Sequence, residues 1–219
     1  PEEKDAYFLR GSAELELGDY ESAKADFDQA ISMDPKNYDR LIEIYEALAA
    51  HGYREVGQEY LQNVLDTAKQ LDAYDSGRIY YYLGEYQKAY LALDEARDKG
   101  GADSYLYLGR AYAATGDYNY ASSVYNNYLS KQGPNAEIYN ELGLCELAKK
   151  ESQNALAAFQ AGKQIEGKRM KVETLDMTRS RQKRNDFFET DELVKGFFFS
   201  SRRRHTRLVS DWSSRVLFR

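Results

Sequence analysis

The sequence predicts an all-α protein: an α-solenoid of about five stacked helix-turn-helix hairpins, followed by an irregular C-terminal tail. Three observations predict this class. A short motif returns every 32 to 34 residues, apolar side chains within each repeat follow helical spacing, and Gly or Pro marks the helix ends. The five repeats cover residues 4–37, 38–69, 70–101, 102–135 and 136–167.

The repeat is clearest in the tripeptide Gly-Asp-Tyr, which begins at Gly18 and again at Gly116, with the near copy Gly-Glu-Tyr at Gly84. A small residue stands three positions after each Tyr. The full series is Ala23, Gly57, Ala89, Ala121 and Ala155, with gaps of 34, 32, 32 and 34 residues. One hairpin cannot bury its apolar stripe alone, so we expect the hairpins to stack and cover one another. Small residues are expected where the two helices of a hairpin cross.

Each repeat predicts two helices, and the fourth repeat shows the pattern best. Its first helix has apolar or small residues at i, i+3, i+4 and i+7, namely Tyr105, Leu108, Gly109 and Tyr112. Its second helix repeats this spacing with Tyr118, Ala121, Tyr125 and Tyr128. The two helices are separated by Gly116-Asp117, a helix stop followed by an N-cap residue.

Helix ends are predicted at matching places along the chain. Repeat one ends at Asp34-Pro35 and repeat four at Gly133-Pro134, because a residue before Pro disfavours helix and Pro cannot continue one. In repeat two, His51 precedes Gly52 and suits a helix C-terminus. The boundaries therefore agree with the period of the repeat.

The chain is rich in Tyr, with 20 Tyr beside a single Trp. Large side chains are needed to fill the space between stacked hairpins, and this role explains much of the Tyr content without any binding function. The expected core positions are Tyr7, Phe27, Tyr105, Tyr112, Tyr125, Tyr139 and Phe159.

This pattern resembles the tetratricopeptide repeat over residues 4–167. That repeat has an aromatic residue, then Leu-Gly, a Tyr, an Ala, a second aromatic residue and a Pro at fixed spacing. Repeat one has Arg10 where Leu is usual. Repeat two has Tyr45 where the first small residue belongs and Gly57 where Ala belongs, and repeat three has Ala73 in place of its first aromatic residue.

The resemblance implies a right-handed superhelix whose first helices line a concave face, where proteins of this family bind peptides or partner segments. The residues carried over to this face are Phe8, Ser12, Ile42, Glu46, Tyr74, Arg78, Tyr81, Tyr82, Leu106, Arg110 and Asn140. Arg78 and Arg110 stand 32 residues apart and are expected side by side. We hypothesise that they and the neighbouring Tyr residues bind a carboxylate-bearing partner. The alternative is that each Arg pairs with a nearby acidic residue of this chain.

Composition and motifs argue against catalysis, cofactors and nucleic acid. Residues 1–167 carry a net charge of −13, from 16 Lys and Arg against 29 Asp and Glu, which repels a phosphate backbone. His51 and Cys145 lie in different repeats without ligand spacing, so no metal site or Cys/His nucleophile is predicted, and Cys145 is expected to be buried. Carboxylates such as Glu21, Asp26 and Asp28 are expected on a solvated face. The sequence therefore predicts no enzyme and no cofactor.

The division of the chain is predicted at residue 167, with a helical repeat domain at 1–167 and an irregular tail at 168–219. The tail carries +7, contains no Tyr, and is expected to be non-native or frameshifted. Its end, residues 197–219, resembles a translated sequencing adapter. The chain begins without Met or a signal peptide and shows no membrane-spanning run, so we expect a truncated N-terminus and either a cytoplasmic or a bacterial cell-envelope location.

The leading functional expectation is a protein-binding or peptide-binding adaptor or assembly scaffold that uses the concave face. The alternative is a small-molecule or glycan site in the Tyr-rich groove of a bacterial cell-envelope protein, because aromatic faces support either mode.

Overall fold

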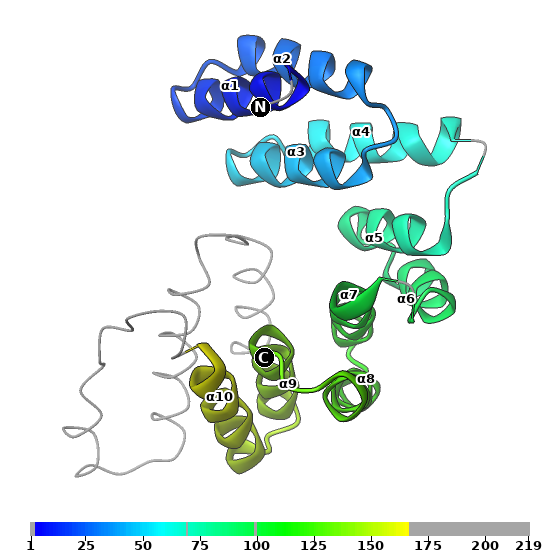
Figure 1. Cartoon of the computed structure of the whole chain (residues 1–219), viewed down its shortest axis with the longest axis vertical. Coiled ribbons are helices and arrows are strands. Elements are labelled where there is room, and N and C mark those ends of the chain that lie inside the picture. The colour runs from blue at the N-terminus through cyan, green and yellow to red at the C-terminus, as the bar shows by residue number, and fades with distance from the viewer. Residues whose placement is uncertain (1–2, 69, 99, 167–219) are drawn as a thin grey trace, which may run out of the picture. The chain divides into compact units, whose positions relative to one another are not determined.

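A computed structural model describes residues 3–68, 70–98 and 100–166. These residues form ten α-helices and no strand, which confirms the all-α prediction (Figure 1). The helices are α1 (Glu3–Glu16), α2 (Tyr20–Met33), α3 (Tyr38–Ala50), α4 (Arg54–Thr67), α5 (Ala73–Leu83), α6 (Tyr86–Glu95), α7 (Gly101–Ala114), α8 (Tyr118–Gln132), α9 (Ala136–Ala148) and α10 (Ser152–Glu166). Two helices fall in each predicted repeat. The predictions for residues 168–219 lie outside the described residues.

The chain divides into two compact units, Pro1–Gly84 with α1 to α5 and Glu85–Arg219 with α6 to α10. In the first unit, α1 packs on α2 and α3 packs on α4, as Figure 1 shows. In the second unit, α7 packs on α8 and α9 packs on α10, while α6 contacts α7 and α8 contacts α9. Within each unit the helices therefore form hairpins that stack on their neighbours.

Helix ends lie where Gly and Pro predicted them. Helix α2 ends at Met33, before Asp34-Pro35, and α8 ends at Gln132, before Gly133-Pro134. Asp19 caps α2, since its side chain accepts a hydrogen bond from the Ser22 backbone N–H at 3.2 Å. Asp117 occupies the same place before α8, but its side chain makes no capping hydrogen bond. The predicted N-cap position of Asp117 is therefore confirmed, although its side chain does not cap the helix.

One turn position is left-handed in every repeat, and four of the five residues there are Gly. Gly18, Gly52, Gly84 and Gly116 have φ between 80° and 93°. The fifth, between α9 and α10, is Lys150 with φ of 65°. A side chain with a Cβ is disfavoured in this conformation by about 1–2 kcal/mol. The turn between α9 and α10, with Lys150 in this conformation, is therefore a point of backbone strain.

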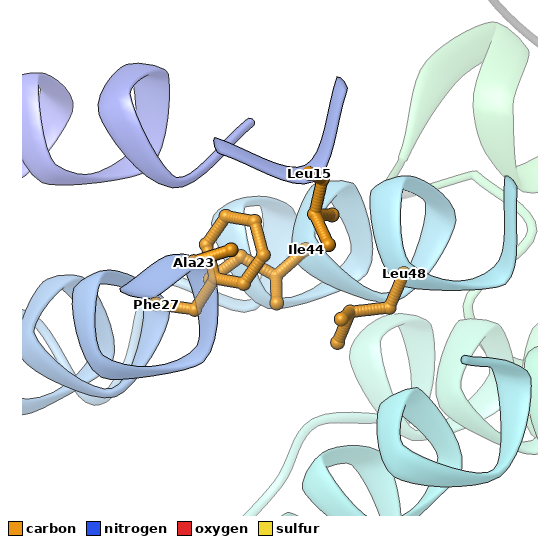
Figure 2. Packing of buried hydrophobic residues seen from close by; sticks show 5 residues of the cluster. All are labelled: Leu15, Ala23, Phe27, Ile44 and Leu48. Atoms are coloured by element: carbon orange, nitrogen blue, oxygen red, sulfur yellow. The ribbon is translucent and has the colours of Figure 1, made fainter. Parts of the chain in front are cut away.

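The core of the first compact unit joins its two hairpins. Figure 2 shows Leu15, Ala23 and Phe27, from α1 and α2, packed against Ile44 and Leu48 of α3. All five side chains are 3% exposed or less. Each hairpin thus covers an apolar stripe that the other could not bury alone.

Small residues occupy the predicted crossing positions. Ala23, Ala89, Ala121 and Ala155 are each 0% exposed, and Gly57 is buried as well. Of the expected large core residues, Phe27, Tyr105, Tyr125 and Phe159 are 1% exposed or less, whereas Tyr7, Tyr112 and Tyr139 are half-buried. The periodic small residues therefore mark the close contacts, and four of the seven large ones fill the space between helices completely.

Several of these close contacts pair a glycine with an aromatic ring. A Cβ on Gly109 would lie 2.3 Å from ring atoms of Tyr125, and one on Gly143 would lie 2.6 Å from Phe159. The second hairpin reverses the order of the two residues. There the ring belongs to Tyr45 on the first helix, and a Cβ on Gly57 of the second helix would lie 2.9 Å from it. The departure of repeat two from the family pattern is thus a swap of large and small partners.

One expectation about surface carboxylates was wrong. Glu21 and Asp28 are exposed as expected, but Asp26 is only 6% exposed. The Arg10 guanidinium donates two hydrogen bonds to Asp26, at 2.5 and 2.6 Å. These hydrogen bonds raise the pKa of Arg10. Arg10, the residue that replaces the usual Leu, therefore folds back over α2 and pairs with a buried carboxylate.

Candidate functional site

Arg78 of α5, one of the predicted site residues, lies between two carboxylates and over an aromatic ring. Its Nη1 donates to Asp39 of α3 and its Nη2 to Asp75, both at 2.5 Å, and its guanidinium carbon lies 4.3 Å from the centre of the Tyr74 ring. Burial disfavours the charge of Arg78, but the hydrogen bonds to Asp39 and Asp75 outweigh it and raise the pKa. The side chain of Arg78 is 8% exposed and that of Asp39 is 77% exposed. Arg78 therefore ties α5 to α3 and leaves Asp39 facing solvent.

A second contact joins the same two helices. The Tyr82 hydroxyl donates to Glu46 Oε1 at 2.5 Å, and Tyr82 is 4% exposed. Its ring packs edge-on to half-buried Tyr81 at 5.4 Å and against Tyr45 at 5.1 Å. Glu46 is thus occupied as a hydrogen-bond acceptor, and Tyr81 is the more accessible ring of the pair.

Sequence reasoning missed Arg40, which makes the corresponding contact between α3 and α1. Its guanidinium lies 4.1 Å from the centre of the predicted Phe8 ring, and it pairs with Asp5 at 2.6 Å and with Glu43 at 2.8 Å. Ser12, also predicted, donates its hydroxyl to the Phe8 carbonyl oxygen at 2.9 Å. The Arg40–Glu43 spacing of three residues was visible in the sequence, but nothing there placed Phe8 beneath the guanidinium.

In the second compact unit, Arg110 of α7 binds two carboxylates of α9. It donates to Glu141 at 2.7 Å and to Glu137 at 2.9 Å, and it lies 6.0 Å from the centre of the Tyr107 ring. Glu137 and Glu141 are four residues apart, so they share one side of α9. In the sequence, this contact could have been inferred from the two Glu residues four apart in the repeat that follows Arg110.

The remaining predicted residues of this unit are packed rather than free. Leu106 is 3% exposed. The Oδ1 atom of Asn140 has no hydrogen-bond donor among the described residues, and it lies close enough to α10 that a Cβ on Gly162 would come within 2.9 Å of it. Asn140 therefore lies at the contact between α9 and α10.

The predicted face thus consists of two kinds of residue. Four of its members are buried: Ile42, Arg78, Tyr82 and Leu106. Seven are half-buried: Phe8, Ser12, Glu46, Tyr74, Tyr81, Arg110 and Asn140. Both predicted arginines pair with acidic residues of this chain, the alternative that the sequence left open. Their side-by-side placement stays a prediction, because Arg78 and Arg110 belong to different compact units.

The described residues offer few groups for other chemistry. Burial raises the pKa of the Cys145 thiol, which is 1% exposed, so this Cys is neutral and inaccessible at neutral pH. Within the same residues, no three His, Cys, Asp or Glu side chains are placed to hold a metal ion. None of the helices described is both long and apolar enough to cross a bilayer.

Comparisons with known proteins agree with this architecture. Two models of the tetratricopeptide repeat match the sequence, one at residues 4–37 and the other at residues 74–119 and 108–165. No curated protein matches it.

Solved structures share the fold at low sequence identity. A thermophilic TPR protein of Thermus thermophilus is 16% identical, with a TM-score of 0.57 over 87% of this chain and 98% of its own. A tetratricopeptide repeat protein of Parabacteroides merdae is 16% identical, with a TM-score of 0.53 over 87% and 69%. The MamA protein is 23% identical over 78% of this chain and 96% of its own, with a TM-score of 0.48. Since the family matches together span more than half of the 219 residues and the hairpins have the expected close contacts, the chain belongs to the tetratricopeptide-repeat family.

Proposed function

We propose that this chain is a non-enzymatic scaffold that binds an extended segment of another protein along the first helices of its hairpins. Tetratricopeptide repeats generally serve as protein-interaction modules and not as enzymes. The observation that carries the finer proposal is the cluster on α3 and α5, where Tyr74, Arg78 and Asp39 are held together by the contacts described above.

Preorganisation is the physical reason that this cluster suits binding. A surface whose side chains are already fixed loses less conformational entropy when a partner binds. Arg78 is too deeply buried to meet a partner, so it acts as a positioning residue for Tyr74 and Asp39. The contact surface then consists of half-buried Tyr74 and Tyr81 with the exposed carboxylate of Asp39. Tyr is among the residues that most often dominate binding energy at interfaces.

The test begins with a peptide array probed with the full chain, followed by titration of the best-binding peptide. We expect Tyr81→Ala to weaken that peptide about tenfold, because truncating an interface hot spot costs more than about 1 kcal/mol. Tyr120→Ala is the matched control, since Tyr120 is a 64% exposed Tyr on the second helix of a hairpin. Equal affinities of the parent and a folded Tyr81→Ala variant would contradict the proposal.

A second candidate, binding of a glycan or small molecule, draws on a different group of tyrosines. Tyr90 of α6 stacks on Tyr112 of α7 at 4.5 Å, and Tyr112 stacks on Tyr120 of α8 at 5.5 Å. The outer ring, that of Tyr120, is the exposed one and could stack on a sugar. Oligosaccharide titration distinguishes the candidates, because this mode loses affinity in Tyr120→Ala and keeps it in Tyr81→Ala.

The lack of nucleic-acid binding stays a prediction. Its physical basis is the net charge of −13 over residues 1–167. A mobility-shift titration with duplex DNA at low salt checks it, and the expected result is no shift.

A further inference from the structure

The arginines on the first helices of the described hairpins are already paired within the chain. Each guanidinium contacts two carboxylates and lies over an aromatic ring; the four residues are Arg10, Arg40, Arg78 and Arg110. A carboxylate of a partner would have to compete with these carboxylates of the chain. The arginines therefore hold helices together and do not favour an acidic partner.

Helices α3 and α5 carry more carboxylates than cations. They contain Asp39, Glu43, Glu46 and Asp75 against Arg40 and Arg78, and neither helix contains Lys. The side chains of Asp39 and Glu43 are 77% and 51% exposed. After the internal pairs are formed, the charge that this surface shows to solvent is therefore negative.

Two carboxylates of this surface show that its negative charge is not fully balanced. Burial raises the pKa of Glu43; the charges of Asp39 and Glu46 add to this rise, and Arg40 opposes it without cancelling it. Burial also raises the pKa of Asp75, although its own arginine partner opposes the rise. A further cation beside these groups would stabilise their charged forms.

Asp39 and Glu43 are spaced to meet two cations of an extended chain. They are four residues apart on α3, so they lie on one side of the helix at about 6 Å from each other. In an extended segment, residues two apart point to the same side and are separated by about 7 Å. Half-buried Tyr74 and Tyr81 of α5 provide aromatic area for apolar side chains of the same segment. A segment that combines cationic and apolar residues therefore suits both helices.

We propose that the surface of α3 and α5 binds a cationic segment of a partner protein. Two Lys or Arg side chains, two residues apart in the segment, pair with Asp39 and Glu43, and neighbouring apolar side chains pack on Tyr74 and Tyr81. Complementary charge of this kind selects the partner and speeds its association. This inference rests on the proposed function and adds the chemistry of the segment that is bound.

Other cationic occupants fit this surface less well. Residues 168–219 of this chain carry +7, but their two densest basic runs, 179–184 and 202–207, contain no apolar residue for the tyrosines. A second copy would bring a helical region that carries −13 over residues 1–167, and like charges at a contact cost binding energy. A partner segment with both cations and apolar residues meets neither obstacle.

The test screens the full chain against an array of short synthetic peptides that differ at two positions, two residues apart. Both positions are Lys, both are Glu or both are Gln, and the other positions vary among apolar and aromatic residues. We expect only the Lys set to bind. The tightest Lys peptide is then titrated by fluorescence anisotropy at about 0.15 M salt, where attraction between distant charges is screened.

The decisive variant combines Asp39→Asn with Glu43→Gln, which removes both charges and keeps acceptor oxygens for the two arginines. We expect it to weaken the Lys peptide at least tenfold. The matched control combines Glu55→Gln with Glu59→Gln, which removes two exposed carboxylates four residues apart on α4 and is expected to leave the affinity unchanged. Circular dichroism of each variant checks that it is folded.

The contrary outcomes are distinct from one another. Equal affinities of Lys and Glu peptides, an unchanged affinity in the Asp39→Asn and Glu43→Gln variant, or an equal loss in the control would overturn the inference. Glu peptides that bind and lose affinity in Tyr81→Ala would overturn it and leave the proposed function standing, whereas an array without any binder would overturn both. Carbodiimide cross-linking of the chain alone completes the test. A link from Asp39 or Glu43 to a lysine of residues 168–219 would assign the surface to this chain's own tail and overturn the assignment to a partner.

Discussion

Replacing the buried glycines with alanine tests the packing of the hairpins directly. In a helix interior, Gly→Ala alone stabilises by about 1 kcal/mol. At Gly109 the new Cβ would lie 2.3 Å from the Tyr125 ring, which is 0% exposed. Overpacking a core costs about 1–3 kcal/mol, and the short distance indicates the upper end of this range. The expected net result is a loss of about 2 kcal/mol in the free energy of unfolding.

The other hairpins provide a graded series for the same argument. The new Cβ would lie 2.6 Å from the Phe159 ring in Gly143→Ala and 2.8 Å from the Phe27 ring in Gly11→Ala. We therefore expect a loss of about 1 kcal/mol for Gly143→Ala and a change near zero for Gly11→Ala, where the helix preference offsets the clash. Urea unfolding followed by circular dichroism gives the three values.

A double-mutant cycle identifies the cause of the loss at Gly109. Leu61 and Leu93 stand in repeats two and three where Tyr125 stands in repeat four, and both are 0% exposed. Tyr125→Leu should therefore relieve the clash, and we expect a coupling of more than about 1 kcal/mol between Gly109→Ala and Tyr125→Leu. A Gly109→Ala variant as stable as the parent, or a Gly11→Ala variant that loses the most, would refute the reasoning.

Three further predictions concern the turns, the buried thiol and the ion pairs. Lys150→Gly should raise the free energy of unfolding by about 1 kcal/mol, because it removes the strain of a positive φ, and Gly116→Lys should lower it by a similar amount; urea unfolding measures both. Burial raises the pKa of Cys145, so above about pH 8.5 the thiolate forms only in the unfolded chain. The free energy of unfolding of the parent should then fall relative to that of Cys145→Ala by about 1.4 kcal/mol per pH unit. Unfolding measurements from neutral to alkaline pH check this, and the same pH dependence in both proteins would contradict it. Arg110→Met should cost about 1–3 kcal/mol, because it leaves half-buried Glu141 without its donor, and adding Glu141→Gln should recover part of the loss in an unfolding cycle.

The sequence alone predicted the helical hairpins well, because periodicity is a local property. Apolar spacing, Pro after Asp34 and Gly133, and the recurring turn glycines determine where helices begin and end within a few residues. The series from Ala23 to Ala155 also predicted the buried crossing positions, since only small residues permit two helices to approach closely. The swap at Tyr45 and Gly57 was visible as a departure from the pattern, but its compensation required the two side chains to be seen in contact.

Tertiary structure decided the electrostatics of the candidate face. Whether Arg78 or Arg110 is available to a partner depends on carboxylates of neighbouring helices, such as Asp39 on α3 and Glu137 on α9, and sequence distance says nothing about which of these lies within 3 Å. The exposure of three apolar residues of α1, Ala6, Leu9 and Ala13, was also decided there. They follow the same helical spacing as buried residues elsewhere, and only packing shows that no described helix covers them. Helical periodicity depends on near neighbours along the chain, whereas ion pairing and burial depend on residues that only folding brings together.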